Sequence, residues 1–222
     1  MSKLMVIAGA TGLIGAAAVD IAIARGWRVI ALVRNPAKLK PRDGLDAWAA
    51  DFDDLGALAE RLKALAPKAF LCALGTTIKI AGSQEAFARV DLDYVTAFAR
   101  LGIACGATSF GIVTAVGSSE ASSNFYLRTK GKAEAAVRAA GYEHVEIAQP
   151  SFLVGERAEQ RAGEGMATAV SQALAPLLLG PLAKYRPISG VNVARALVAG
   201  LEQPQRGVFV RRYADLRAMA QA

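Results

Sequence analysis

Tyr126 and Lys130 are the two side chains whose types and spacing best suit catalysis in this chain. Residues four positions apart share one face of a helix, so the phenol and the ammonium can point into the same site. A nearby cation favours phenolate over phenol and lowers the tyrosine pKa, which suits proton transfer to a substrate oxygen. We therefore expect Tyr126 and Lys130 to be catalytic; the alternative is a pair on the surface of an ordinary helix.

A second signal lies near the N-terminus, where a short apolar run ends in three evenly spaced glycines, Gly9, Gly12 and Gly15. In this pattern the first glycine permits a tight strand-to-helix turn, and the second lets the backbone approach a pyrophosphate. The third lets the helix pack close to the strand. The amides and the positive dipole end of the helix then face the anion. The run predicts a dinucleotide-binding turn formed by Gly9, Thr11, Gly12, Leu13, Ile14 and Gly15.

The residue after the second predicted strand indicates which dinucleotide binds. A protein that prefers NAD usually has Asp or Glu at this position, but here the strand runs into Arg34, and the first acidic residue after the strand is Asp43. The guanidinium of Arg34 fits a 2′-phosphate, which a carboxylate would repel. We expect NADP(H) to be favoured over NAD(H); Lys38 could assist Arg34, although a surface position is expected for it. The alternative is that Arg34 is a solvated residue that opens a turn.

Further cofactor contacts are expected after the third and fourth predicted strands. Asp51 and Phe52 suit the rim of an adenine pocket, although Asp51 could instead cap the next helix. Gly75 would let the backbone pass beside the cofactor, and Thr76 or Thr77 could hydrogen-bond to a ribose or phosphate, although a plain loop fits as well. The expected contacts in these two segments are Asp51, Phe52, Leu74, Gly75 and Thr76.

Strand-like and helix-like segments alternate along the chain, which is typical of a parallel sheet covered on both faces. The predicted strands are 4–8, 28–33, 45–50, 69–73, 109–115, 144–147 and 208–210. The predicted helices are 12–25, 54–65, 84–101, 125–139, 164–174, 192–201 and 214–219. The fold class is therefore α/β, a single-domain Rossmann fold with a doubly wound parallel sheet of six or seven strands. We expect a cofactor-binding core at 1–150 and a small C-terminal appendage on the substrate side at 151–222.

Composition narrows the class of protein. A chain of 222 residues with 54% hydrophobic and 20% charged residues is typical of one globular domain. The net charge is +7, and the basic residues are scattered along the chain. An anionic cofactor accounts for part of this charge, so no nucleic acid partner is expected.

The spacing of Cys72, Cys105 and the single histidine does not match a metal site. We therefore expect no metal and two buried, reduced cysteines. No segment is long enough to span a bilayer and no signal peptide is evident, so we expect a cytoplasmic protein.

The motifs together resemble an atypical, single-domain short-chain dehydrogenase/reductase, most closely the branch of the Tat-interacting oxidoreductase-like proteins. The resemblance covers about residues 4–164. It rests on the segments 9–15, 74–77, 89–95, 122–126 with Lys130-Gly131, 150–151 and 155–157. It implies an NADP(H)-binding Rossmann domain with Tyr126 and Lys130 in the catalytic positions. It also implies that the loop containing Pro150 and Leu153 lies near the nicotinamide.

The chain departs from this family at the third catalytic position, where a serine at the end of the fifth strand would bond the substrate oxygen. Matching the segments places Thr114 there, and threonine supplies the same hydroxyl; Ser118 is the alternative, and both could be plain loop hydroxyls. Gln149 stands where this branch often has arginine. Asp91 matches a family position but could equally be a solvated helix residue, and we expect His144 to be exposed at the start of a strand.

We expect an NADPH-dependent oxidoreductase that transfers hydride to a small carbonyl substrate. Thr114 would orient the carbonyl, Tyr126 would donate the proton, and Lys130 would tune the tyrosine and hold the nicotinamide ribose. The alternative is an NADPH-binding regulatory or sensor protein with little or no turnover, because the short appendage leaves little chain for a substrate pocket. A sugar-nucleotide epimerase-like enzyme ranks third. A homodimer could form through the apolar stretch 173–183, and the sequence does not identify the substrate.

Overall fold

A seven-stranded parallel sheet forms the centre of the molecule in the computed structural model, which describes residues 3–154 and 180–221. The strand order is β3-β2-β1-β4-β5-β6-β9, and every neighbouring pair is parallel. The strands are β1 (Leu4–Ala8), β2 (Arg28–Val33), β3 (Leu45–Ala49), β4 (Ala69–Cys72), β5 (Ser109–Val113), β6 (His144–Ala148) and β9 (Gly207–Arg211). The predicted α/β fold class is confirmed.

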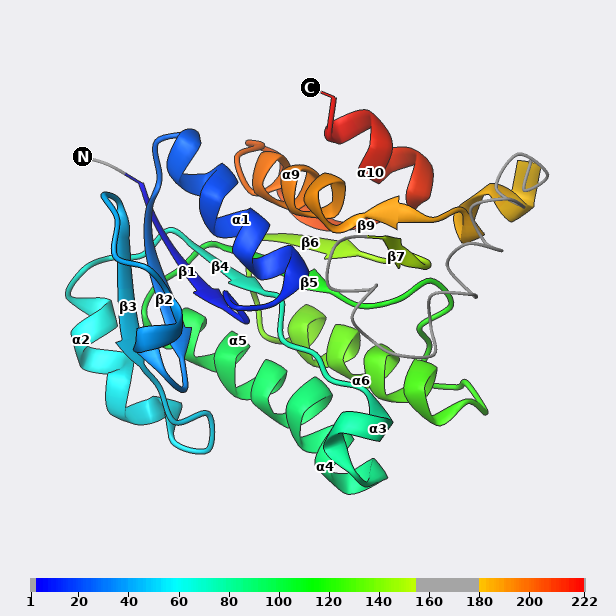
Figure 1. The fold of residues 1–222 in the computed structure, drawn as a ribbon, viewed down its shortest axis with the longest axis horizontal. Coiled ribbons are helices and arrows are strands. Elements are labelled where there is room, and N and C mark those ends of the chain that lie inside the picture. Colours follow the sequence, from blue (N-terminus) through cyan, green and yellow to red (C-terminus); the bar gives the residue numbers. More distant parts are fainter. Residues whose placement is uncertain (1–2, 155–179, 222) are drawn as a thin grey trace.

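Helices cover both faces of this sheet (Figure 1). On one face lie α1 (Leu13–Ala24), α9 (Gly190–Gly200) and α10 (Tyr213–Met219), and on the other lie α2 (Ala59–Lys63), α5 (Tyr94–Ala104) and α6 (Phe125–Ala139). All residues of β1 are buried, because alternate side chains enter two separate cores. Met5 and Ile7 pack on the α1 and α9 side, whereas Val6 and Ala8 pack on the α5 and α6 side.

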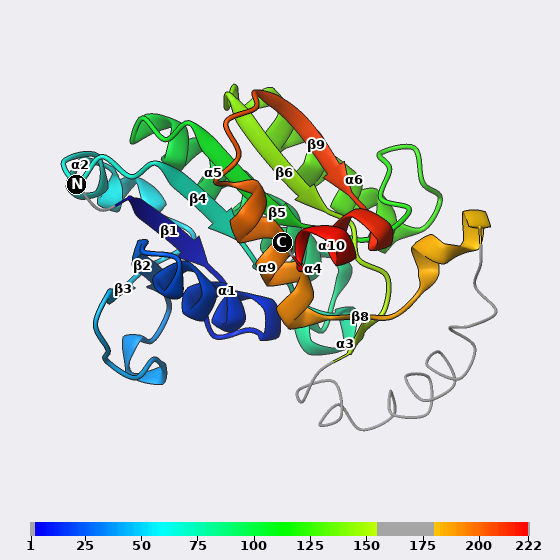
Figure 2. The same ribbon diagram turned by 90° about the horizontal axis from the view of Figure 1, so that it is seen from above.

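Short elements gather beyond the carboxyl ends of the strands. Figure 2 shows α3 and β8 in this region, next to the end of the sheet from which the strands point outward. Besides α2, the short elements in the described residues are η1 (Pro36–Lys38), η2 (Leu55–Leu58), α3 (Ile78–Ala81), α4 (Gln84–Ala88), a π-helical turn η3 (Arg89–Asp93), β7 (Leu153–Val154), η5 (Gly180–Tyr185) and β8 (Ile188–Ser189). Strands β7 and β8 pair with each other as a separate two-stranded sheet.

The structure differs from the predicted elements in several places. The predicted helix 54–65 is split into η2 and α2, and the predicted helix 84–101 contains the π-turn. The segment after residue 150 is not only an appendage, since β9 pairs with β6 and α9 packs against α1. Buried Val193 and Leu197 of α9 explain this, because they join the same core as α1. The predicted helix 164–174 lies outside the described residues, as does most of the apolar stretch 173–183.

The expected burial of Cys72 and Cys105 and the expected exposure of His144 can be compared with the structure. Cys72 and Cys105 are buried free thiols, as predicted. The expectation that His144 is exposed is wrong, because its ring is buried between two acceptors: Nε2 lies 3.2 Å from Oε1 of Glu146, and Nδ1 contacts the Gln205 carbonyl. Within residues 3–154 and 180–221, every helix is too short or too polar to cross a membrane.

Candidate functional site

The turn between β1 and α1 has the geometry that its glycines predict. Gly9 has φ +83°, and a Cβ at this position would overlap the Ala73 carbonyl oxygen. A Cβ at Gly15 would likewise overlap the Gly9 carbonyl oxygen. Gly12 precedes α1 in an extended conformation and offers no capping side chain, and the first turn of α1 contains no acidic residue. The turn therefore presents main-chain amides at the positive end of a helix, which suits a phosphate.

A pocket of about 390 Å³ lies beside this turn, and we call it the β2 pocket. Its lining residues are Gly9, Thr11, Leu32, Val33, Arg34, Asn35, Lys38, Phe52 and Leu74. The pocket brings together five of the predicted cofactor contacts, namely Gly9, Thr11, Arg34, Phe52 and Leu74. Lys38 is exposed, as the surface expectation has it, and also lines the pocket, where it adds a second cation to that of Arg34. The pocket therefore suits an anionic group held beside an apolar wall.

Asp51 is exposed and is not among the residues that line the β2 pocket. Its Oδ1 accepts a hydrogen bond from the Asp53 N–H at 2.9 Å, which makes a local turn. It does not cap the next helix, because Asp54 precedes η2. Its role as an adenine contact stays a prediction.

The turn after β4 carries Gly75 and Thr76 to a buried ion pair. The Thr76 N–H donates to Oδ2 of Asp91 at 2.9 Å. Oδ1 of Asp91 lies 2.6 Å from Nζ of Lys130. A Cβ at Gly75 would lie 3.5 Å from Oδ1 of Asp91 and 3.7 Å from Nζ of Lys130. The predicted residues Gly75, Thr76 and Lys130 therefore meet around one acidic side chain.

Tyr126 and Lys130 lie in the first turns of α6, as predicted. Asn124 caps this helix by accepting a hydrogen bond from the Leu127 N–H at 3.1 Å. The Tyr126 ring packs on Phe87 of α4 with ring centroids 5.7 Å apart, and 37% of the tyrosine remains exposed. Lys130 is buried. The pair thus combines an accessible phenol with a buried ammonium on one helix.

The electrostatic effect on Tyr126 is opposite to the one expected from the sequence. Burial raises the pKa of Tyr126 above its usual value, Lys130 lowers it, and Asp91 raises it again, so that the pKa is raised. The expected lowering was wrong chiefly because the sequence does not reveal how far the phenol is buried, and secondarily because Asp91 opposes the effect of Lys130. Burial alone would lower the pKa of Lys130, but the carboxylate of Asp91 and the phenol of Tyr126 raise it.

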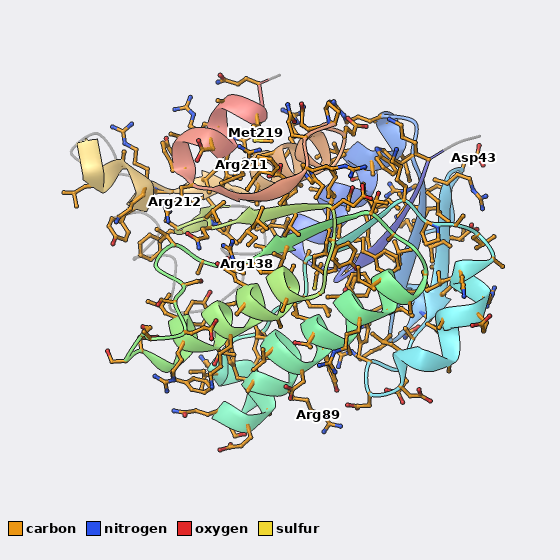
Figure 3. The ribbon with its side chains drawn as sticks, turned by 180° about the vertical axis from the view of Figure 1, so that it is seen from behind. Asp43, Arg89, Arg138, Arg211, Arg212 and Met219 are labelled. Atoms are coloured by element: carbon orange, nitrogen blue, oxygen red, sulfur yellow. The ribbon has the colours of Figure 1, made fainter. Side chains whose placement is uncertain are left out.

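Thr114 lies at the end of β5 in a buried hydrogen-bonded network. Its hydroxyl donates to Oε1 of Glu134 at 2.6 Å, and Nε2 of Gln149 donates to the same oxygen at 2.9 Å. Nε of Arg212 donates to Oε1 of Gln149 at 3.2 Å, and Nη2 of Arg138 lies 3.7 Å from Oε2 of Glu134. Figure 3 labels both arginines. Glu134 lies about 12 Å after Tyr126 along the axis of α6, so the Thr114 hydroxyl is engaged by a residue about two turns beyond the tyrosine.

Ser118, the alternative to Thr114, is also engaged. Its hydroxyl donates to the Ala115 carbonyl at 2.7 Å, and it accepts a hydrogen bond from the Ala115 N–H at 3.3 Å. The choice between Thr114 and Ser118 stays a prediction.

The loop after β6 contains the last two predicted contacts. Pro150 is buried, and its carbonyl accepts a hydrogen bond from the Val116 N–H at 2.9 Å. Leu153 is half-buried at the start of β7, where it pairs with Ile188. The bond between Val116 and Pro150 ties the loop to the segment that follows β5, at the edge of the sheet where α6 also begins. The contact of Pro150 and Leu153 with a nicotinamide stays a prediction.

Asp91 is the main site residue that the sequence prediction left out. A solvated position was considered for it, but its side chain is fully buried. The apolar spacing contained a usable signal, because Phe87 and Val95 lie four positions before and after Asp91 and both are buried. A carboxylate on the buried stripe of a helix needs a partner, which here is Lys130.

Comparisons with known proteins agree with this geometry. Residues 9–204 match the family model described as NAD(P)H-binding. Protein HTATIP2 of Rattus norvegicus is 34% identical over 136 residues, which are 61% of this chain and 54% of that protein. Protein FMP52, mitochondrial, of Coccidioides immitis is 30% identical over 207 residues, which are 88% of this chain and 84% of that protein.

A solved structure shows the same fold. The Bordetella bronchiseptica enzyme WbmH in complex with NAD+ has a TM-score of 0.68 and 14% identity, with 96% of this chain and 75% of that chain covered. The names of the fungal relatives contradict one expectation from the sequence. They are named mitochondrial proteins, so the expected cytoplasmic localisation was wrong.

Proposed function

Since the chain belongs to the NAD(P)H-binding family and to the atypical short-chain dehydrogenase/reductase branch of its HTATIP2 and FMP52 relatives, we propose that it is an NADPH-dependent reductase of small carbonyl compounds. The observation that supports this most is the position of Tyr126 and Lys130 on α6. They lie at the carboxyl edge of the same sheet whose β1–α1 turn and β2 pocket fit a dinucleotide. The names of the FMP52 relatives support a mitochondrial setting.

The residues present fit a dinucleotide because the backbone around Gly9 and Gly15 leaves no room for a Cβ and ends at a helix N-terminus. The amides of that turn would hold the pyrophosphate. Arg34 and Lys38 would hold a 2′-phosphate in the β2 pocket, which is why NADP(H) is preferred over NAD(H) in this proposal. Phe52 would line the adenine side.

NADPH supplies a hydride to the carbonyl carbon when it is bound. Tyr126 would donate its phenolic proton to the carbonyl oxygen as negative charge develops there, so that an alcohol forms. Solvent then returns a proton to the phenolate, which the 37% exposure of Tyr126 permits. Lys130 would hold the nicotinamide ribose hydroxyls and favour the phenolate once it has formed. Thr114 or Ser118 would orient the carbonyl oxygen after exchanging its present partner.

The proposal is tested by NADPH binding, followed by fluorescence, and by NADPH oxidation across a panel of carbonyl compounds. We expect Tyr126→Phe to lower turnover by roughly 10²- to 10⁴-fold, because it removes the proton donor, while NADPH binding changes little. Tyr213→Phe is the matched control, since it removes a hydroxyl from α10 that accepts only from Arg217 among the described residues. Turnover that is equal in Tyr126→Phe and the wild type would refute the assigned role.

A second candidate function is an NADPH-binding sensor with little turnover. The observation that favours it is the engagement of both candidate hydroxyls, since Thr114 is bonded to Glu134 and Ser118 to Ala115. Binding of NADPH without Tyr126-dependent oxidation on any compound of the panel would support the sensor.

A further inference from the structure

We propose that the substrate of this site is an apolar carbonyl compound, an aldehyde or ketone whose hydrocarbon part binds to Ile78, Ile80 and Phe152 beside Tyr126. We call these four residues, Ile78, Ile80, Tyr126 and Phe152, the apolar rim. The inference rests on the proposed function and deepens it by naming the class of substrate.

Large apolar side chains that are exposed to solvent gather at the carboxyl edge of the sheet. Among the described residues ten such side chains are exposed, and three of them, Leu65, Ile103 and Val208, lie toward the amino ends of the strands. The other seven lie on α3, α6, the loop after β6, η5 and the start of α9. Ile80 and Phe152 are the most exposed, at 66% and 58%. Exposed apolar residues that gather in one region mark a binding site, whereas single ones are ordinary surface residues.

The short helix α3 begins close to both members of the proposed catalytic pair. A Cβ at Gly75 would lie 3.7 Å from Nζ of Lys130. Ile78, the first residue of α3, is three residues further along the chain, and three residues span at most about 11 Å. The Tyr126 ring packs on Phe87 of α4, the helix that follows α3. The apolar side chains of α3 are therefore within reach of a substrate whose carbonyl is held by the phenol.

The loop after β6 brings Phe152 to the same end of the sheet. The Val116 N–H donates to the Pro150 carbonyl at 2.9 Å, and the Ser119 N–H donates to the Leu127 carbonyl at 3.2 Å. The segment after β5 thus joins the loop of Phe152 to the first turn of α6. Figures 1 and 2 show α3 and the β7–β8 pair at this same end, beyond the carboxyl ends of the strands.

The hydroxyl groups next to the rim are already engaged within the protein. Oγ1 of Thr77 accepts a hydrogen bond from the Ile80 N–H at 3.2 Å, and the Ser151 hydroxyl donates to the Arg186 carbonyl. The two hydroxyls considered for the third catalytic position are bonded as well. A substrate with many hydroxyl groups, such as a sugar, would have to replace these bonds, whereas a hydrocarbon chain requires none of them.

The rim also carries little charge. Segments 78–81 and 150–154 contain a single charged residue, Lys79. Each methylene that is fully buried on such a surface strengthens binding by about fourfold. A chain that lies partly exposed along the rim should gain about twofold for each methylene. The length of the substrate should therefore determine how well the protein uses it.

The first test follows NADPH oxidation with butanal, hexanal, octanal and decanal, and with erythrose as the hydroxylated counterpart of butanal. We expect kcat/KM to rise about two- to fourfold for each added methylene, and erythrose to be a poorer substrate than butanal. A kcat/KM that stays constant or falls with chain length, or a preference for erythrose, would overturn the inference.

The second test removes apolar surface from the rim. Ile80→Ser and Phe152→Ser should each lower kcat/KM for decanal about three- to tenfold and change that for butanal less than about twofold. Ile103→Ser is the matched control, because Ile103 is exposed near the end of α5, at the opposite end of the sheet. A ratio of decanal to butanal activity that is the same in all three variants and the wild type would contradict the assignment of the rim.

Two other occupants of the rim predict different results. If a second copy of the chain covers it, Ile80→Ser would change the sedimentation coefficient and leave the dependence on chain length unchanged. If residues 155–179 of the same chain cover it, Ile80→Ser and Phe152→Ser would lower the unfolding temperature and again leave this dependence unchanged. Either result would overturn the inference.

Binding of N-alkylformamides, which are unreactive analogues of aldehydes, separates this inference from the proposed function. Calorimetry with and without NADPH measures their affinity, which should rise from the butyl to the decyl compound and fall for the decyl compound in Phe152→Ser. If the wild type reduces no carbonyl compound, the proposed function is refuted, yet a rising affinity would still support an apolar ligand at the rim. An affinity that does not depend on chain length would refute it.

Discussion

Arg34 is exposed at the end of β2, where it and Lys38 give the β2 pocket two positive charges. If these charges hold a 2′-phosphate, Arg34→Glu should weaken NADPH binding about 10- to 100-fold, because a charge-assisted hydrogen bond of about 1.5–3 kcal/mol is replaced by repulsion. NADH binding should change little. Fluorescence titration with both coenzymes measures this, and Lys40→Glu makes the same charge change at an exposed residue outside the pocket. Unchanged NADPH affinity in Arg34→Glu would refute the cofactor preference.

The Thr114 hydroxyl stabilises the fold through its buried hydrogen bond to Glu134, whether or not it takes part in catalysis. Thr114→Val should lower the free energy of unfolding by about 1–3 kcal/mol, since an oxygen of buried Glu134 loses a donor. Thr114→Ser keeps the hydroxyl and should recover most of the loss. Denaturant unfolding of the three proteins measures the difference. Equal stability of Thr114→Val and the wild type would show that the Thr114–Glu134 bond contributes nothing.

At the scale of the elements, those set by local pattern could be predicted and those set by distant contacts could not. The bounds predicted for β1, β2 and α6 agree with the structure, because alternation, continuous apolar runs and the Asn124 cap are visible in the sequence. The π-turn at Arg89–Asp93 has no propensity signal of its own and interrupts a continuous helical pattern. The helix α3 spans only Ile78–Ala81, which is too short to show periodicity.

The packing of α6 against the loop after β5 depends on Gly131. A Cβ at this position would overlap the carbonyl carbon of Ser119 and lie 2.5 Å from the Glu120 nitrogen. Both are main-chain atoms, so relief requires the helix or the loop to move. We expect Gly131→Ala to lower the free energy of unfolding by about 1–3 kcal/mol, although alanine is the better helix former by about 1 kcal/mol.

Thermal or denaturant unfolding measures the effect of Gly131→Ala, with Lys132→Ala as the control on the exposed face of the same helix. The control should stay within about 0.5 kcal/mol of the wild type. A stabilised Gly131→Ala protein would show that the loop yields easily and that the close approach is not required.

At the scale of the whole molecule, the general place of the site could be predicted but its charge pairing could not. The carboxyl edge follows from the strand order, and the glycine turn, Arg34, Tyr126 and Lys130 all lie along it. The partners of buried charges come from segments far apart in the chain, as for Asp91 with Lys130 and Glu134 with Gln149. No local pattern encodes such pairs. The direction of the Tyr126 pKa was predicted wrongly chiefly because burial of the phenol raises it, with Asp91 adding a smaller rise.

A second buried charge cluster joins the edge of the sheet and bears on the stability of the whole fold. Glu146 on β6 is fully buried and accepts two hydrogen bonds from Arg211 on β9, at 2.8 and 3.0 Å. Figure 3 labels Arg211 on that strand. His144 precedes Glu146 on the same face of β6, and its ring contacts both Glu146 and the Gln205 carbonyl. The cluster thus ties β6, β9 and the segment before β9 together.

This cluster predicts how stability varies with pH. The hydrogen bond that the His144 ring donates to Glu146 raises the pKa of His144 above its usual value, although burial opposes it, and the Gln205 carbonyl adds to the rise. A pKa that is raised on folding means that stabilisation is complete below the unfolded value of about 6.5 and is lost as pH rises through the folded value. Because His144 is the single histidine of the chain, this loss of stabilisation is caused by deprotonation of His144. The free energy of unfolding should therefore fall above about pH 6.5, by at most about 1.4 kcal/mol per pH unit. Urea unfolding over this range, compared between the wild type and His144→Gln, measures the slope; a slope that persists in His144→Gln would show that another group causes it.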